Sequence, residues 1–306
     1  RQNVLAGSTV RESFHDLQAI NECLDEQSAN GTTVVAAADG QTLGYFTFGP
    51  IATIAEDPAL KINVADFAVV GSTKSYALTY GRKDIPPGIS KPSDLAKATK
   101  VFVGGYSRSS LHDTRLRLSL ELLGAPYQMV TGFQTIGAIN KAMVQNELNF
   151  TSSTLPGWTT QGIPQVVQAG VGAPMFQFSY YGPDGKPTGY AGLTKQGVPT
   201  FEEVYADAFG KPPSGPKWEA LVLSNHLGTQ MQRLIVFPKG TPDEAVQTMR
   251  KAFQDVAKDP EFIAAFERVT SEVPDLGRPE EIEPLLAKMR NVDPAIKKVV
   301  QESIAE

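Results

Sequence analysis

Hydroxyl side chains gather at one point of this chain where their position favours anion binding. Residues 101–103 are β-branched or aromatic and predict a strand, a glycine pair follows, and Ser107, Ser109 and Ser110 precede a leucine-rich segment. The first turn of a helix has backbone N–H groups without intrahelical partners, and the helix dipole is positive there. A strand that passes into a helix through these serines therefore suits an anion such as a carboxylate. Arg108 adds a guanidinium that can pair bidentately with such a group.

The same loop also comes close to the G-x-S-x-G elbow of serine hydrolases, with Ser107 as the nucleophile. The fifth position holds Ser109 instead of glycine, which disfavours the tight strand-to-helix turn. The elbow further requires an acid and then a histidine downstream, and these would be Asp184 or Asp207 followed by His226. A catalytic Ser107 therefore stays open as the alternative to an anion-binding loop.

The elements that must position this loop alternate along the chain. Apolar residues at spacings of three and four predict helices, and short β-branched or aromatic runs predict strands. Alternating strands and helices of this kind indicate an α/β fold with largely parallel sheets. The predicted helices span 10–25, 111–123 and 137–145, and the strands span 32–36, 43–48, 67–70, 76–80, 101–103, 148–150 and 234–237. Residues 67–70 and 76–80 are expected to pair, and 151–154 to form another hydroxyl-rich loop.

The composition and net charge of the chain exclude several classes of function. A chain of 306 residues suits two domains or one large α/β unit, and its net charge of −5 argues against nucleic acid as a partner. Cys23 is the only cysteine and the three histidines are far apart, so neither an internal disulfide nor a zinc site is expected. No apolar run reaches 18 residues, which predicts no membrane insertion. Because the chain starts at Arg1 without methionine, we expect a mature or trimmed product.

Six segments in order resemble one family, the solute receptors of the tripartite tricarboxylate transporters, also called TctC or Bug receptors. The resemblance runs from about residue 38 to about residue 270. The family also has an earlier loop rich in proline and glycine. Here Ala6–Thr9 is either the remnant of that loop or the counterpart of a second one. The six segments are 38–43, 67–71, 101–123, 131–138, 198–203 and 237–242.

The resemblance implies a two-lobed periplasmic binding protein of type II, in which each lobe is a mixed, mostly parallel sheet flanked by helices. Residues 1–100 with 229–306 would form lobe 1 and residues 101–228 lobe 2, with the ligand cleft between them. By position, the cleft residues would be Ser107, Arg108, Ser109, Ser110, Phe133, Thr135, Ile136, Gly137, Ser152, Ser153, Thr154, Thr47 and Gly49.

The function implied is reversible binding of a small organic carboxylate and its delivery to the subunits of a membrane transporter. The resemblance implies no catalysis and no cofactor, and we expect a monomer. A receptor that presents its ligand to a sensor protein stays open, as does the hydrolase. The sequence does not identify the carboxylate.

Overall fold

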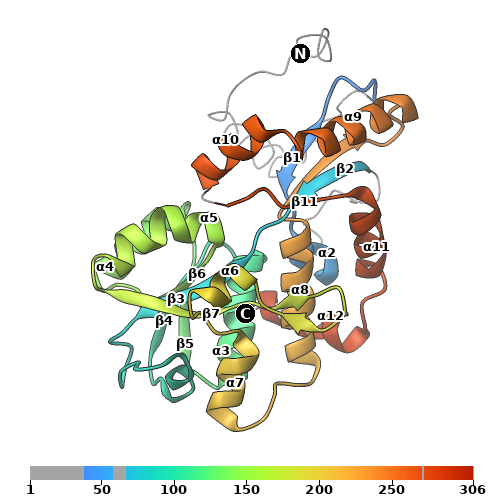
Figure 1. Ribbon diagram of the computed structural model, residues 1–306. Coiled ribbons are helices and arrows are strands. Elements are labelled where there is room, and N and C mark those ends of the chain that lie inside the picture. Colours follow the sequence, from blue (N-terminus) through green and yellow to red (C-terminus); the bar gives the residue numbers. More distant parts are fainter. Residues whose placement is uncertain (1–37, 58–66, 271, 306) are drawn as a thin grey trace.

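The computed structural model describes residues 38–57, 67–270 and 272–305, which form two lobes, each built on a sheet with helices on both faces (Figure 1). The predicted helix at 10–25, the predicted strand at 32–36 and Ala6–Thr9 lie outside the described residues. Within the described ranges, no helix combines the length and apolar character needed to cross a lipid bilayer.

The first sheet has four strands, and every pair among the described strands is antiparallel. The prediction of mostly parallel strands is therefore wrong for this lobe, because strand direction depends on the path of the chain between strands and not on local residue pattern. Its strands, in spatial order, are β1 (Gly44–Thr47), β10 (Arg233–Pro238), β2 (Phe67–Thr73) and β11 (Leu276–Gly277).

Alternating residues of the first sheet face two helices. Ile235 and Phe237 of β10 pack with α9 (Asp243–Val256), whereas Leu234 and Val236 join the core on the side of α11 (Pro279–Met289). Between these two helices along the chain lies α10 (Pro260–Thr270), which contains no buried residue. Figure 1 shows α10 projecting from the first lobe towards the second.

The second sheet has five strands and carries the segments of interest. In it β4 runs parallel to β5 and β6, whereas β3 runs antiparallel to β6 and β7. The strands in spatial order are β5 (Tyr127–Val130), β4 (Val101–Gly104), β6 (Phe150–Thr154), β3 (Ala77–Arg82) and β7 (Gly172–Gln177). A separate hairpin joins β8 (Tyr180–Tyr181) to β9 (Pro187–Thr188).

Helices cover both faces of the second sheet. The helices on one face are α3 (Leu111–Leu123), α7 (Phe201–Phe209) and α8 (Pro216–Gln230), which share a core cluster with β4 and β7. On the other face lie α4 (Ile136–Val144), the short α5 (Leu155–Gly157) and the π-helical segment η3 (Trp158–Val167). The remaining short helices are η2 (Pro92–Lys97) and α6 (Ala191–Lys195).

The chain crosses between the lobes where β2 leads into β3. The amide of Ser75 donates to the carbonyl of Thr229, and that of Lys74 donates to the carbonyl of Asp275, so three segments meet here. The predicted boundary near residue 100 differs from this, because β3 already belongs to the second sheet. For the same reason β2 and β3, which we expected to pair, lie in different sheets. A strand pattern shows that a segment is extended, not which strands become its neighbours.

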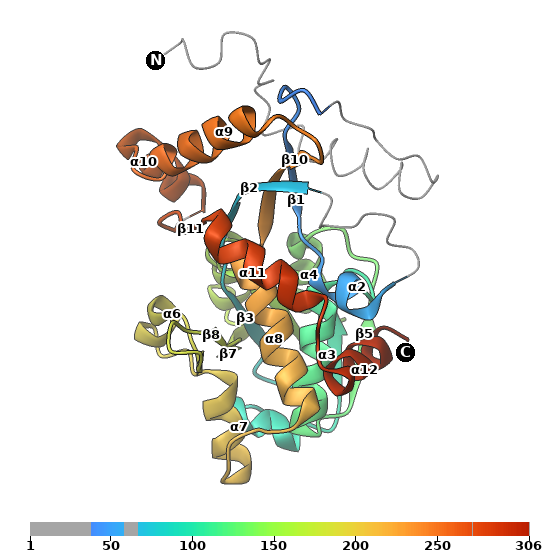
Figure 2. The same cartoon turned by 90° about the vertical axis from the view of Figure 1, so that its right-hand side faces the viewer.

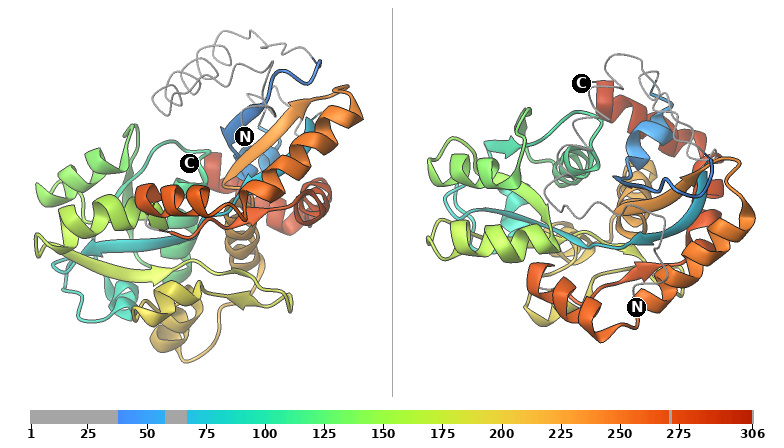
Figure 3. Two further views of the ribbon diagram at one scale, coloured as in Figure 1. Left: turned by 45° about the horizontal axis from the view of Figure 1, so that its top comes forward. Right: turned by 90° about the horizontal axis from the view of Figure 1, so that it is seen from above.

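The C-terminal helix ties the lobes together from outside. Figure 2 shows α12 (Pro294–Ala305) beside α2 (Pro50–Ala55), and it also contacts α3 and α8. Buried residues of α2, α8 and α12 belong to one apolar cluster that reaches from the first sheet to the second. The view from above in Figure 3 shows the chain passing from β2 in the first lobe into β3 in the second. The end of β6 lies next to this junction, because the amide of Leu155 donates to the carbonyl of Tyr76 at 2.8 Å.

Candidate functional site

Two of the predicted loops lie side by side at the carboxyl ends of neighbouring strands. The amide of Gly105 donates to the carbonyl of Val130 at 2.9 Å, and that of Gly132 donates to the carbonyl of Tyr106 at 2.9 Å. These bonds extend the parallel pairing of β4 and β5 beyond the strand ends. The loops that lead into α3 and α4 are therefore held together, as expected for parallel strands of one sheet.

The N-terminus of α3 already contains a carboxylate of the protein itself. Asp113 is fully buried, and its Oδ1 accepts hydrogen bonds from the amide of Tyr106 at 2.8 Å and from the hydroxyl of Ser110 at 2.9 Å. Ser110 in turn caps the helix by accepting from the amide of Asp113. The anion-binding position that we expected at this helix end is thus filled internally, so a ligand carboxylate finds less positive potential there.

A buried cation and a buried histidine complete this inner cluster. Arg115 is 6% exposed, lies over the ring of Phe178 at 4.9 Å, and has its pKa lowered to about 10 by burial. The ring of His112 approaches Asp113 Oδ1 at 2.9 Å through Nδ1 and the carbonyl of Ser152 at 3.0 Å through Nε2. Burial lowers the pKa of His112, although Asp113 acts in the opposite direction. Together, the contacts of His112, Asp113 and Arg115 hold in place the loop that leads into α3.

The N-terminus of α4, in contrast, has no acidic residue in its first turn. Thr135 caps the helix by accepting from the amide of Ala138 at 3.2 Å, and both Thr135 and the preceding Gln134 are exposed. Gly137 is half-buried, and a side chain there would meet Gln161 Oε1 at 2.9 Å. No carboxylate of the first turn therefore offsets the positive end of the α4 dipole, and this helix end is accessible to an anion.

The third predicted loop, 151–154, is not a loop. These residues form the central strand β6, which begins two residues later than we expected. Ser152 and Ser153 are 0% and 5% exposed, and Thr154 alone of the three predicted binding residues in this segment is partly accessible. The small, polar side chains suggested a loop, but β6 is a central strand and the helices on both faces of the sheet cover its side chains.

Arg108, the cation of the first loop, contacts the C-terminal helix. Its Nη1 donates to the carbonyl of Ala305 at 3.3 Å, at the end of α12 where the helix dipole is negative. The neighbouring Arg117 is buried and donates to the carbonyls of Arg108 and Ser303 at 2.9 and 3.0 Å. Both arginines thus attach this loop to α12. Ser107 is exposed and Ser109 half-buried, which leaves their hydroxyls accessible.

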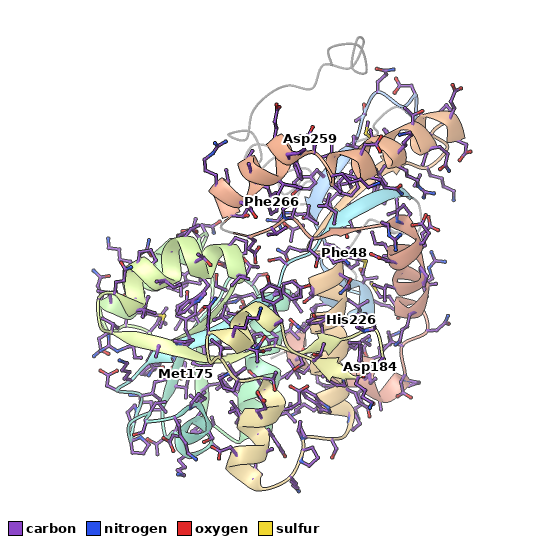
Figure 4. The ribbon with its side chains drawn as sticks, viewed as in Figure 1. Phe48, Met175, Asp184, His226, Asp259 and Phe266 are labelled. Atoms are coloured by element: carbon purple, nitrogen blue, oxygen red, sulfur yellow. The ribbon has the colours of Figure 1, made fainter. Side chains whose placement is uncertain are left out.

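The remaining predicted residues are spread over the two lobes. Thr47 ends β1 and Gly49 precedes α2; both are exposed, while Phe48 between them is buried in the core (Figure 4). Phe133 is half-buried, and Ile136, at the first position of α4, is 9% exposed. Of these, Phe133 lies with the loop pair, because its amide donates to the carbonyl of Gly105.

The residues of the alternative hydrolase make their hydrogen bonds elsewhere. His226 accepts the amide of Tyr181 through Nδ1 at 3.2 Å, and burial lowers its pKa to about 4. Asp184 accepts the amide of Lys186, and Asp207 is bound by Lys91 and Ser93. Figure 4 shows His226 and Asp184 on the side of the molecule that carries α8 and the β8–β9 hairpin. Within the described ranges, no cluster of three or more His, Cys, Asp or Glu side chains is placed to hold a metal ion.

Comparison with known proteins finds similarity in three-dimensional structure. No protein-family model matches the chain, and no curated protein matches its sequence. Among solved structures, a TctC solute-binding protein from Polaromonas has 13% sequence identity and a TM-score of 0.57, over 87% of this chain and 80% of that chain. This chain has the fold of the two-lobed periplasmic solute-binding proteins.

Two further structures agree with this fold. MatC from Rhodopseudomonas palustris, with bound malate, has 19% identity and a TM-score of 0.56 over 88% of this chain and 81% of its own. A second R. palustris protein, with adipate, has 16% identity and a TM-score of 0.55 over 94% of this chain and 93% of its own. The predicted two-lobed α/β fold and the resemblance to these receptors are thereby confirmed at the level of structure.

Sequence reasoning missed Asp113 as the internal partner of the loop and Arg115 as its buried counter-charge. The signal for Asp113 was present, since an acidic residue three positions after a serine N-cap is a known capping pattern. For Arg115 there was no signal, because its partners Asn225 and Phe178 lie far away in the sequence.

Proposed function

We propose that this chain is an extracytoplasmic solute receptor that binds a small organic carboxylate at the N-terminus of α4. The observation that supports this most directly is the contrast between the two helix ends at this edge of the sheet. The end of α3 holds Asp113, whereas the end of α4 is capped only by the neutral Thr135. An anion therefore gains most beside the hydroxyl of Thr135 and the amide of Gly137.

The rest of the proposed site surrounds this helix end. Ser107 and Ser109 supply hydroxyl donors from the adjoining loop, and the ring of Phe133 offers an apolar contact for the body of the ligand. Thr154 lies at the end of the neighbouring strand. From the first lobe, Thr47 and Gly49 are the predicted contacts on closure. With neutral hydroxyl and amide donors only, such a site suits one anchored carboxylate better than three.

The proposal includes delivery of the ligand to the subunits of a membrane transporter from a periplasmic location. The structures with malate and adipate support a carboxylate as the ligand class, since they share the fold at TM-scores of 0.56 and 0.55. The two-lobed form supports reversible capture by closure, which excludes water and strengthens the electrostatic contacts to the bound anion.

Calorimetric titration tests the proposal with malate, succinate, adipate and a monocarboxylate as ligands. We expect saturable binding of at least one of them, and about a tenfold weaker affinity in Thr135→Val, because one charge-assisted contact contributes about 1.5–3 kcal/mol. Thr200→Val is the matched control. Thr200 also caps a helix, accepting the amide of Glu203 at 3.3 Å, but it caps α7, outside the proposed site.

The two threonine variants separate binding from stability. Both lose an N-cap and should be destabilised by similar amounts, about 1 kcal/mol. Only Thr135→Val should lose affinity. Equal affinities in both variants, or no binding of any carboxylate by correctly folded wild-type protein, would contradict the proposal.

A further inference from the structure

A cavity lies at the junction of the lobes, and none of the residues of the proposed carboxylate site lines it. Its volume is about 270 Å³, and its walls come from three parts of the chain. The crossover contributes Lys74 and Tyr76, the segment before α6 contributes Tyr190, and α10 with the segment after it contributes Phe266, Glu272 and Asp275. We call it the crossover pocket. Figure 4 shows Phe266 on α10.

Aromatic rings dominate one side of the crossover pocket. The rings of Tyr76 and Tyr190 stack with their centroids 4.1 Å apart and their planes at 16°, and Tyr180 lies 5.2 Å from Tyr76. Phe266 is half-buried and belongs to a helix without any buried residue, so its ring is accessible to a ligand. Aromatic faces carry negative electrostatic potential and attract cations.

The charged side chains of the pocket differ in whether they have an oppositely charged partner. Asp275 accepts the hydroxyl of Tyr76 at 2.7 Å and lies 3.4 Å from Lys74 Nζ, which also pairs with Glu281 at 3.3 Å. Lys74 is thus already engaged by two carboxylates. The carboxylate of Glu272, by contrast, has no hydrogen bond or ion pair with any residue in the described part of the chain. The two pocket carboxylates outnumber its one cation.

We propose that the crossover pocket binds a small organic ammonium ion, with the charged nitrogen against Glu272 and the carbon groups against Tyr76, Tyr190 and Phe266. An ammonium group supplies the positive charge that Glu272 lacks, and its N–H groups donate to that carboxylate. The same net charge disfavours a carboxylate here. Since both lobes and the crossover contribute walls, an occupied pocket stabilises this arrangement of the lobes.

The affinity of the pocket depends on pH. Burial, with the nearby charge of Asp275, raises the pKa of Glu272 to about 7. The titratable and charged groups around it are Asp275 on its own segment, Lys74 and Tyr76 on the crossover and Tyr190 before α6. Burial raises the pKa of Tyr76 and that of Tyr190, so both hydroxyls stay protonated while Glu272 ionises. Ionisation of Glu272 between pH 6 and 8 should therefore strengthen ammonium binding as the pH rises.

The test uses n-butylammonium and tetramethylammonium chloride with the full chain, followed by calorimetry and by NMR line broadening of the methyl signals. We expect saturable binding of n-butylammonium that is at least five times tighter at pH 8.5 than at pH 5.5. Glu272→Gln should weaken it at least tenfold at pH 8.5. Glu267→Gln, which removes the same charge from an exposed position of α10, should leave it unchanged. Sodium chloride at equal ionic strength is the blank.

Two results would overturn the proposal. One is the absence of saturable ammonium binding by folded wild-type protein at pH 8.5. The other is binding that Glu272→Gln and Glu267→Gln alter equally. Titration of Glu272→Gln with the carboxylate panel measures whether the variant binds carboxylates as the wild type does. Loss of ammonium binding can then be distinguished from a failure of the proposed carboxylate site. Tyr190→Phe, which keeps the ring, should bind n-butylammonium within twofold of wild type.

Discussion

Gly105 is the position at which a single methyl group should disturb the loop most. A Cβ added there would lie 2.7 Å from Asp113 Cγ and 2.8 Å from Asp113 Oδ1, which is closer than real Cβ contacts allow. Asp113 is fully buried and cannot swing into solvent. To make room, its carboxylate must move away from the amide of Tyr106 and the hydroxyl of Ser110, both of which it now accepts.

Three contributions make up the effect of Gly105→Ala on the free energy of unfolding. Overpacking of a buried site reduces the free energy of unfolding by about 1–3 kcal/mol. Weakening two hydrogen bonds to a charged acceptor contributes about 1.5–3 kcal/mol more if the carboxylate moves fully. Alanine also restricts the unfolded chain more than glycine does, which offsets about 0.4–1 kcal/mol of this loss. We therefore expect a net loss of about 1.5–5.5 kcal/mol.

Urea unfolding followed by circular dichroism measures this loss, with an unchanged slope as the sign that the transition is the same. Gly49→Ala is the control, because a Cβ there meets nothing within 4 Å, and its stability should change by less than about 1 kcal/mol. In an Asp113→Ala background the clash disappears, so Gly105→Ala should then have almost no effect. A loss below 0.5 kcal/mol in the wild type, or additive effects in the double variant, would refute the reasoning.

Three further predictions concern other residues. Arg117→Met keeps the apolar stem but removes the donors to the carbonyls of Arg108 and Ser303. The free energy of unfolding should therefore fall by about 2–4 kcal/mol, and the amides of α12 should exchange hydrogen faster. The folded-state pKa of His226, about 4, lies below its unfolded value of about 6.5. The unfolded chain therefore binds the proton first, and stability contributed by neutral His226 is lost as the pH falls from 6.5 towards 4. The difference in free energy of unfolding between wild type and His226→Gln should drop by about 1–2 kcal/mol from pH 7 to pH 5. A fluorophosphonate probe should label wild type and Ser107→Ala equally weakly; selective labelling of Ser107 would support the hydrolase instead.

Local patterns predicted the elements of the second lobe well. The run at 101–103, the glycine pair and the following leucines indicated a strand, a turn and a helix, and β4 and α3 are found there. Gly124, directly after the predicted helix at 111–123, ends it in the left-handed conformation at φ 68°. These features depend on backbone propensity and capping, which act within a few residues and are therefore visible in sequence.

Sheet membership was not visible in the same way. The segment 76–80 was correctly expected to be extended, yet its partners are β6 and β7 rather than β2. The hydroxyl run at 151–154 looked like a loop because its side chains are polar, but it forms a central strand whose faces are covered by helices. In both cases the deciding contacts come from residues far along the chain, so no local pattern contains them.

The sequence alone determined the α/β class, the acidic, cysteine-poor composition and the placement of serines and threonines where strands pass into helices. Only the tertiary structure decided which helix end stays open to an anion. Asp113 folds back into the end of α3, Arg108 is drawn to α12, and Thr135 remains accessible on α4. It also brought Tyr76, Tyr190 and Glu272 into one pocket. The physical reason is that electrostatic potential and accessibility depend on charges and surfaces that folding assembles from distant segments.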